Sequence, residues 1–434
     1  MKFLHISDLH IGKRVNEFPM IEDQRHILKQ ILGIAERERA DAVLIAGDIY
    51  DKAVPSAEAV QVFDWFLTGL ADRGMKVFAV SGNHDSPERV AFGAQLMQGR
   101  GVYLSPVYEG NVEGISLRDS YGELQVWLLP FVKPAAVRHA LEAEREAEGP
   151  ENCQGAPGAE HEAKSLESGQ EVLGAEREAE SLESGQDALG AEREAENPES
   201  YHDAVRIAVR RMKIDDKKRN ILVAHQFVTG AGRCDSEETV VGGLDNVDGS
   251  VFKEFDYVAL GHIHSPQSVG RDTVRYCGTP LKYSFSEAEQ VKSVTVLEMK
   301  GKGDVSISTV PLVPLHDMRR IRGTYMEVTA RSFYRDFERE DYVQVTLTDE
   351  EDVPDGLQKL RTIYPNLMRL VYDNSRTRRE SSIEAAEELE KRSEQELFGE
   401  FYELQNNQPM SAEQENFVKK MFESLREEDG GGKP

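Results

Sequence analysis

The chain has too few cysteines to be held together by disulfide bonds. Only three cysteines, Cys153, Cys234 and Cys277, occur among its 434 residues. Three scattered cysteines cannot form a disulfide framework or a thiolate zinc site, and an odd number is typical of a protein in a reducing compartment. We therefore expect a cytoplasmic protein without structural disulfides.

Long apolar segments are absent as well. No run approaches the roughly 18 apolar residues that a membrane helix needs. Residues 1–6 lead directly into a strand-like pattern and not into a basic and apolar leader. A Gly-rich phosphate loop ending in Lys and Ser or Thr is also missing, so any dependence on ATP has to come from another subunit. We expect no membrane association.

Basic residues are scarce for a protein that would bind phosphates. Lys and Arg number 52 against 78 acidic residues, which gives a net charge of −26. Two segments carry most of this excess, because residues 141–200 contribute −14 and residues 380–434 contribute −9. The rest of the chain carries only −3 of the total of −26, so the global charge does not exclude nucleic acid as a partner.

Short apolar runs alternate with helical spacing in the first hundred residues. The expected strands are 2–7, 42–46 and 76–81, and the expected helices are 22–38 and 57–70. Continuous apolar strands in a βαβαβ order are typical of an α/β fold whose sheet is covered on both faces. Further strands are expected at 124–129, 220–224, 256–260, 274–277 and 293–297. The fold class is therefore α/β.

The acidic segment 141–200 differs in composition from the rest of the chain. It contains a 16-residue repeat of Glu, Ala, Gly, Ser and Arg with few large apolar side chains. Stacked repeats of this kind bury too little apolar surface to offset the entropy of ordering. We expect a mostly disordered insertion in a surface loop, with an array that docks a partner as the alternative.

The C-terminal third predicts a small α+β domain and two terminal helices. Strands over 325–329, 342–347 and 368–372 surround a helix over 356–364. A polar segment without periodicity follows. The stripes 397–404 and 417–425 then predict two amphipathic helices, which either fold back on the core or bind another protein.

Side chains that can bind metal ions follow five of the predicted strands. They are Asp8, His10, Asp48, Asn83, His84, His225, His262 and His264. A single Asp or His after a strand is usually a turn former, but ligands of an α/β sheet collect at the carboxyl ends of its strands. Residues i and i+2 on extended backbone project to one side, so Asp8 with His10, and His262 with His264, can reach one cavity.

The mixture of carboxylate, amide and imidazole favours Mn²⁺, Fe, Co or Zn, and the absence of Cys opposes a thiolate zinc site. Without His84, seven candidate ligands remain, and these exceed the needs of one ion. They match two ions about 3.5 to 4 Å apart that share a carboxylate, an arrangement suited to displacement at phosphorus. Asp48 is the central candidate for the shared carboxylate.

These motifs resemble the calcineurin-like metallophosphoesterase superfamily. Asp-x-His at 8–10, Gly-Asp at 47–48, Gly-Asn-His-Asp at 82–85, His225 and Gly-His-x-His at 261–264 are present in that family's order. The resemblance implies a β-sandwich flanked by helices, with the core in residues 1–140 and 201–312 and the repeat 141–200 as an insertion. It further implies a capping domain at 320–373, a linker at 374–384 and a helical tail at 385–434.

The same resemblance implies the roles of the site residues. One metal ion would be held by Asp8, His10, Asp48 and His264, and a second by Asp48, Asn83, His225 and His262. His84 would lie beside the phosphate and donate a proton or hydrogen bond, with Asp85 orienting its ring. Asp51 has either a supporting role or a role in the turn alone.

Within the superfamily the chain resembles the nuclease subunits of bacterial nuclease–ATPase complexes, through residues 3–12, 46–51, 261–264, 278–280 and 401–404. This implies a Mn²⁺-dependent nuclease with 3′–5′ exonuclease activity on duplex DNA and endonuclease activity on single strands and hairpins. Its roles would be in DNA end processing, recombination and replication. Its partners would be DNA, a coiled-coil ATPase bound by the tail helices, and a second copy within a heterotetramer.

Two other functions stay open on the sequence. A phosphatase or cyclic nucleotide phosphodiesterase would use the same two metal ions and differ in substrate. A scaffold protein with a vestigial site would lack some ligands, and none is missing.

Overall fold

The computed structural model describes residues 1–148, 198–237, 246–335, 338–375, 377, 398–399, 402, 410–411, 414–415, 417–418 and 421. The predicted disorder of the repeat insertion and the two predicted tail helices concern residues that lie largely outside this set, as does most of the predicted linker. Within it, no helix combines the length and the apolar character needed to cross a membrane.

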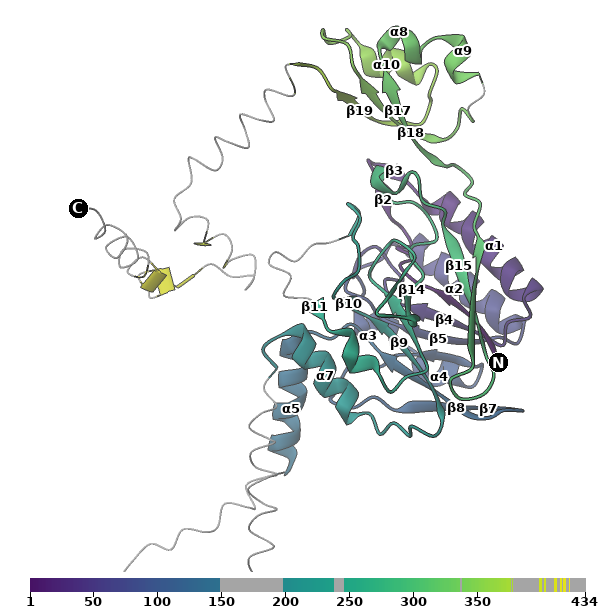
Figure 1. Ribbon diagram of the computed structural model, residues 1–434, viewed down its shortest axis with the longest axis vertical. Helices are drawn as coiled ribbons and strands as arrows, with labels where there is room; N and C mark the ends of the chain where they lie inside the picture. The colour runs from purple at the N-terminus through teal and green to yellow at the C-terminus, as the bar shows by residue number, and fades with distance from the viewer. Residues whose placement is uncertain are drawn as a thin grey trace, which may run out of the picture.

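Two six-stranded sheets form the centre of the molecule (Figure 1). The first has the spatial order β16 (Val305–Pro311), β15 (Ser293–Met299), β1 (Lys2–Ile6), β4 (Ala42–Ala46), β5 (Lys76–Val80) and β6 (Val102–Leu104). The second has the order β13 (Gln267–Val269), β14 (Arg271–Tyr276), β12 (Tyr257–Gly261), β9 (Arg219–His225), β8 (Gly122–Leu129) and β7 (Gly114–Asp119). Their facing sides share one buried cluster that includes Phe3, Leu44, Phe78, Val126 and Ile221. The predicted β-sandwich is confirmed.

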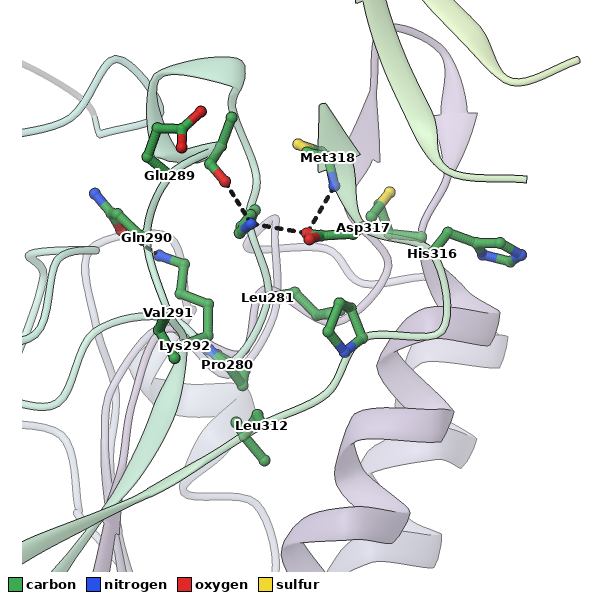
Figure 2. A pocket seen from close by; sticks show the side chains of 14 residues that line it. Pro280, Leu281, Glu289, Gln290, Val291, Lys292, Leu312, His316, Asp317 and Met318 are labelled. Carbon is green, nitrogen blue, oxygen red and sulfur yellow. Dashed lines mark hydrogen bonds and ion pairs between the residues drawn. The ribbon is translucent and has the colours of Figure 1, made fainter. Parts of the chain in front are cut away.

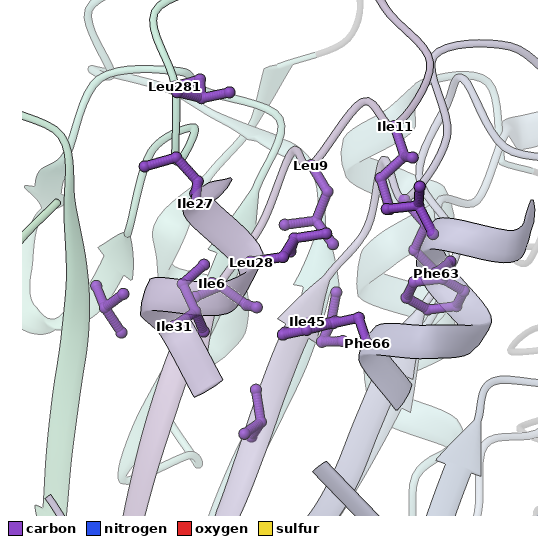
Figure 3. Close-up of a cluster of buried hydrophobic side chains, with 14 of the residues drawn as sticks. Ile6, Leu9, Ile11, Ile27, Leu28, Ile31, Ile45, Phe63, Phe66 and Leu281 are labelled. Carbon is purple, nitrogen blue, oxygen red and sulfur yellow. The ribbon is translucent and has the colours of Figure 1, made fainter. Parts of the chain in front are cut away.

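Helices cover the outer face of each sheet, which explains why the central strands are apolar on both sides. Helices α1 (Ile21–Arg37) and α2 (Ala57–Asp72) pack on the first sheet, where Ile31 and Phe66 meet Ile6 and Ile45 (Figure 3). Helices α5 (Pro134–Glu148) and α7 (Tyr201–Arg211) pack on the second sheet.

Short elements complete the core. They are β2 (Arg14–Val15), β3 (Phe18–Pro19), α3 (Pro87–Val90), α4 (Ala94–Gln98), β10 (Phe227–Val228), β11 (Asn246–Val247), and the 3-10 helices η1 (Gly249–Phe252) and η2 (Phe285–Glu287). Most of them lie in the connections beyond the strand ends.

A second, smaller unit follows β16. Three parallel strands, β17 (Met318–Gly323), β18 (Tyr342–Leu347) and β19 (Leu367–Tyr372), form its sheet. The helices α8 (Tyr325–Val328), α9 (Arg331–Tyr334) and α10 (Gly356–Arg361) belong to the same unit. The unit has a buried cluster of its own, which includes Ile321, Val345 and Leu360. We call this unit the cap; its exact boundaries stay a prediction.

The expected strand at 325–329 is wrong, because this segment is helix α8. Thr324 and Glu327 form a reciprocal capping box, in which the Thr324 side chain accepts the N–H of Glu327 and the Glu327 side chain accepts that of Thr324. This local pairing starts a helix and outweighs the strand preference of Tyr325 and Val328. The third strand of the cap is β17, which ends just before the capping box.

A buried carboxylate connects the cap to the core. Asp23, on the first turn of α1 and only 1% exposed, accepts a hydrogen bond from the Tyr342 hydroxyl at 2.8 Å and from the backbone N–H of His316 at 3.1 Å. A cavity of about 230 Å³ lies at this junction, lined on opposite sides by Lys292 and Asp317 (Figure 2). The cap is therefore joined to the core by polar contacts with α1, in addition to the apolar packing of Met318, Tyr342 and Met368 in the cluster under that helix.

Replacement of Asp23 by Ala is expected to loosen the cap. The Tyr342 hydroxyl and the His316 N–H would lose their acceptor, which costs about 2 to 4 kcal/mol when both donors stay buried. Chemical unfolding should show this loss, and limited proteolysis should cleave the segment 312–317 faster. The neighbouring Glu22→Ala variant is the matched control. Equal stability and equal cleavage of the two variants would contradict this role of Asp23.

Candidate metal centre

The predicted ligands converge beyond the carboxyl ends of five central strands. Asp8 and His10 follow β1, Asp48 follows β4, and Asn83 follows β5 in the first sheet. His225 is the last residue of β9, and His262 and His264 follow β12 in the second sheet. Ligand atoms of Asp8, His10 and His264 lie within 4.8 Å of one another, and so do those of Asp8, Asp48 and His225. The site thus bridges the two sheets at one edge of the sandwich.

Asn83 ties the two sheets together within this cluster. Its Oδ1 lies 2.9 Å from His225 Nε2 and 2.9 Å from His262 Nδ1. His10 Nε2 and His264 Nε2 are separated by 3.2 Å. The structure therefore brings together all seven side chains that the sequence singled out as ligands.

The backbone of this site is left-handed at four of these residues. The φ angles are +51° at Asp8, +44° at His10, +48° at Asp48 and +98° at His262. The expectation that the 8–10 and 262–264 pairs lie on extended backbone is therefore wrong, although both pairs do reach one cluster. Such angles cost free energy in residues other than glycine and persist where surrounding contacts enforce them, often at functional sites.

Backbone hydrogen bonds enforce this conformation. The N–H of Asp8 donates to the Gly47 carbonyl at 3.0 Å, and the N–H of His10 donates to the Asp48 carbonyl at 2.9 Å. Close packing leaves no room beside these loops, since a Cβ atom on Gly82 would lie 2.1 Å from Asp48 Oδ1, and one on Gly261 would lie 1.8 Å from the Ala46 carbonyl oxygen. Gly82 and Gly261, two of the three glycines in the motifs, are thus needed for close approach.

His84 lies at the more open side of the cluster. Its Nε2 is 3.9 Å from Asp48 Oδ2, and its Nδ1 is 3.2 Å from the carbonyl oxygen of Asp51. The Asp85 carboxylate accepts the N–H groups of Ile49, Tyr50 and Gly82 at 2.9 to 3.0 Å. Through these bonds Asp85 connects the loop that follows β4 to the loop that follows β5. Its role in orienting His84 stays a prediction.

Several residues that support the cluster were not identified from the sequence. Gln24, next to Asp23 on α1, donates to the His10 carbonyl at 2.7 Å and accepts the N–H of Gly12 at 2.9 Å. The Ser236 hydroxyl lies 2.6 Å from His264 Nδ1, and Glu237 accepts the N–H of His264 at 2.7 Å. No spacing rule relates them to the ligands, because only the tertiary fold brings them close.

Burial and nearby charges shift the pKa values of the side chains in the cluster in different directions. Burial raises the pKa of Asp8 to about 7. Burial opposes the positive charge of His225, but the nearby Asp48 carboxylate still raises the pKa of His225 to about 9. Burial lowers the pKa of His262 to about 3 and those of His10 and His264 well below the usual value. Three imidazoles are therefore neutral and keep a lone pair.

The hydrogen bonds of His225 show that this donor set fits a cation. Its Nδ1 lies 2.8 Å from the Ala46 carbonyl and must therefore carry a hydrogen. Its Nε2 then faces Asp48 Oδ2 at 3.3 Å, and a carboxylate oxygen can only accept. Two acceptors at this distance repel each other unless a proton or a metal ion lies between them. Nδ1 of His10 is also buried without a hydrogen-bond partner in the described part of the chain. The cluster thus suits divalent metal ions with nitrogen and oxygen ligands.

Comparisons with known proteins agree with this geometry. A family model described as calcineurin-like phosphoesterase matches residues 1–266, and one described as type 5 capsule protein repressor C-terminal domain matches residues 314–406. The D subunit of the nuclease SbcCD from Staphylococcus epidermidis is 28% identical over 437 aligned residues, which cover 99% of this chain and all of that protein.

Two solved structures are more distant. A dimetal phosphatase from Danio rerio has 13% identity and a TM-score of 0.36, with 73% of this chain and 98% of that chain covered. A protein from Thermus thermophilus has 14% identity and a TM-score of 0.33, with 71% and 98% covered. Both TM-scores lie below 0.5, so these two likenesses carry no argument.

The metal-free protein is expected to lose stability as the pH rises. His225 has a folded-state pKa of about 9, above its usual 6.5, so its contribution is complete below pH 6.5 and is lost as the pH rises through 9. The loss is roughly 3 kcal/mol, and Asp8 adds to it in the same direction as the pH rises through about 7. Unfolding with a chelator between pH 6 and 9 measures this effect.

Saturating divalent metal should reduce this loss, because a cation then occupies the position of the proton. The His139→Gln variant on α5 is the control for a histidine outside the cluster, and His225→Gln should flatten the pH dependence. A chelated parent protein with constant stability up to pH 9 would disprove this distribution of protons.

Proposed function

Because the chain belongs to the calcineurin-like phosphoesterase family, we propose that it is a metal-dependent nuclease that hydrolyses the phosphodiester bonds of DNA. The observation that carries this proposal is the cluster of two carboxylates, one amide and four imidazoles beyond the ends of the sheet strands. The relative that aligns over 99% of the chain is described as a nuclease subunit, which supports DNA as the substrate.

The ligands divide into two groups that share Asp48. We assign one divalent ion to Asp8, His10, Asp48 and His264, and a second to Asp48, Asn83, His225 and His262. Oxygen and nitrogen ligands without thiolate suit Mn²⁺, Fe, Co or Zn, and we propose Mn²⁺ because the resemblance to the nuclease subunits implies it. When bound, two such ions neutralise charge on a phosphodiester and favour deprotonation of a water molecule.

We propose that His84 donates a proton or hydrogen bond to the leaving oxygen of the phosphodiester. The Asp51 carbonyl beside Nδ1 fixes a hydrogen on that atom, so that Nε2, 3.9 Å from Asp48 Oδ2, is the nitrogen that faces the cluster. His84 is partly exposed, with 17% of its side chain accessible, whereas the ligand histidines are buried. Asp85 keeps the loop of His84 rigid through its three backbone hydrogen bonds.

The substrate range that we propose is the one implied by the resemblance of the motifs to nuclease subunits of bacterial nuclease–ATPase complexes. It comprises 3′–5′ exonuclease activity on duplex DNA and endonuclease activity on single strands and hairpins, in DNA end processing, recombination, repair and replication in the cytoplasm. Lys13 is a basic residue near the cluster, bound to Asp51 at 2.8 Å. It supplies positive charge close to the position of the phosphate.

A coiled-coil ATPase of the SbcC type is the protein partner that we propose for the C-terminal tail. The relative is a subunit of the SbcCD complex, and the family model for the C-terminal region extends to residue 406. The predicted tail helices would provide the apolar stripes for this contact.

A second copy of the chain is the other partner. Phe92, just before α4, is 81% exposed, and Leu96, on α4, is 86% exposed. Trp65 and Val60 on α2 are also exposed. Large exposed apolar side chains of this kind often mark a protein interface. We propose a homodimer through the exposed side chains at α4 within a heterotetramer with the ATPase.

His84→Ala is expected to abolish most DNA cleavage while leaving metal binding intact. Loss of a general acid lowers the rate about 10²- to 10⁴-fold. The measurement is cleavage of end-labelled duplex and single-stranded DNA in Mn²⁺, with His139→Ala as the control. Hydrolysis of a phosphomonoester with no cleavage of DNA would favour a phosphatase, and hydrolysis of a cyclic nucleotide alone would favour the corresponding phosphodiesterase. A chain that binds no metal would be the scaffold protein.

Phe92→Glu combined with Leu96→Glu is expected to convert a dimer into a monomer, because four buried charges would face one another in the interface. Light scattering coupled to gel filtration measures the mass. Tyr121→Glu, an equally polar change at an exposed aromatic residue between β7 and β8, should leave the mass unchanged. A parent chain that is monomeric at high concentration would refute the dimer.

A further inference from the structure

The second ring nitrogen of His264 contacts a buried relay outside the ligand set. The Ser236 hydroxyl lies 2.6 Å from His264 Nδ1 and 2.5 Å from Glu287 Oε1. The other oxygen of Glu287 accepts a hydrogen bond from the Lys292 ammonium at 2.5 Å. Glu287 is fully buried and Lys292 is 4% exposed. The order of the relay is therefore Lys292, Glu287, Ser236 and His264.

Glu287 determines the direction of every hydrogen in this relay. A carboxylate that pairs with an ammonium group can only accept, so the single hydrogen of the Ser236 hydroxyl points to Glu287. The Ser236 oxygen must then accept, and the hydrogen between Ser236 and His264 belongs to Nδ1. A neutral imidazole has one N–H, so Nε2 of His264 has the lone pair.

We infer that Ser236 and Glu287 are positioning residues that fix the tautomer of His264 for metal binding. This inference rests on the proposed function, in which His264 is a ligand. Nε2 of His264 is the atom that faces His10 within the cluster, at 3.2 Å. Hydrogen bonds from the other ring nitrogen to a fixed acceptor commonly set the tautomer and orientation of a metal-binding histidine.

The position of His264 is fixed separately from its tautomer. Glu237 accepts its backbone N–H at 2.7 Å, and Lys292 donates to its carbonyl at 2.9 Å. Lys292 also donates to Gln290 at 2.9 Å, beside the cavity at the junction with the cap (Figure 2). A change at Ser236 or Glu287 therefore tests the tautomer while these backbone contacts remain.

Glu287→Gln is the sharpest test because it reverses the relay without a change of shape. Lys292 Nζ donates to this side chain at 2.5 Å and therefore requires the amide oxygen on its side, and this outweighs the 3.3 Å contact of the Tyr283 N–H with Oε1. The amide NH₂ then points to Ser236, whose hydrogen turns to Nδ1 of His264. The hydrogen of the imidazole moves to Nε2, which can no longer bind metal. We expect about a ten- to hundred-fold loss of Mn²⁺ affinity.

Adding Ser236→Ala to Glu287→Gln should recover part of the affinity, because the hydroxyl that forces the wrong tautomer is gone. Ser236→Ala alone should weaken binding, since Nδ1–H loses its acceptor, and Ser236→Thr should retain binding. The matched control is Ser265→Ala, whose hydroxyl is bonded to Gln290 at 2.7 Å. Ser236→Ala is thus expected to weaken Mn²⁺ binding in the parent chain and to strengthen it in Glu287→Gln.

Calorimetric titration with Mn²⁺ alone measures affinity, and ¹⁵N spectra of the histidines in chelated protein report the tautomer. The inference predicts hydrogen on Nδ1 of His264 in the parent and on Nε2 in Glu287→Gln. Parent-like affinity in Glu287→Gln, or a double variant weaker than it, would overturn the relay. If Glu287→Gln does not fold, the comparison of Ser236→Ala with Ser236→Thr tests the relay. Equal Mn²⁺ affinities of these two variants would overturn the relay. A parent chain without Mn²⁺ binding would refute the proposed function, while the spectra would still decide the tautomer.

Discussion

The repulsion among buried acceptor atoms is the constraint on which the structure depends. Two carboxylates, an amide oxygen and the lone pairs of buried imidazoles meet in a small volume, where the N–H groups of His84 and His262 satisfy only part of Asp48 and Asp8. Such a cluster is unfavourable by itself and becomes stable when a proton or a metal ion enters. The surrounding fold has to force these groups together. Four left-handed residues and two glycines that permit contact with neighbouring loops show how closely it does so.

The layers of the sandwich supply that force. Central strands that are buried on both faces hold the loops of β1, β4, β5, β9 and β12 at one edge. The first turn of α1 adds a connection to the cap, because two adjacent side chains point to different partners. Asp23 holds Tyr342 and His316, while Gln24 holds the backbone of His10 and Gly12. The cap and the loop of His10 are therefore attached to the same helical turn.

The sequence predicted the core strands and the convergence of seven side chains because both follow local rules. Apolar runs such as 42–46 coincide with β4, and motifs at strand ends gave all seven side chains of the cluster. The prediction of a strand over 325–329 was wrong, since a capping box at Thr324 and Glu327 outweighed the apolar pattern. The left-handed backbone at Asp8 and His10 also went unpredicted, because hydrogen bonds with Gly47 and Asp48 impose it.

Contacts between distant segments were beyond the reach of sequence patterns. Ser236 and Glu287 are 51 positions apart and share no motif, yet they meet behind His264. Asp85 is part of a motif that contains candidate ligands, whereas its carboxylate accepts hydrogen bonds from the backbone of two loops. Residues that act through another residue are thus visible only once the fold is known.

The most direct test of the account is anomalous diffraction from a crystal of the chain grown with Mn²⁺. Two peaks are predicted on opposite sides of the Asp48 carboxylate, one beside His10 and His264 and one beside Asn83, His225 and His262. A single peak away from Asp48, or no ordered metal at saturating Mn²⁺, would contradict the central claim that this cluster is a two-metal centre.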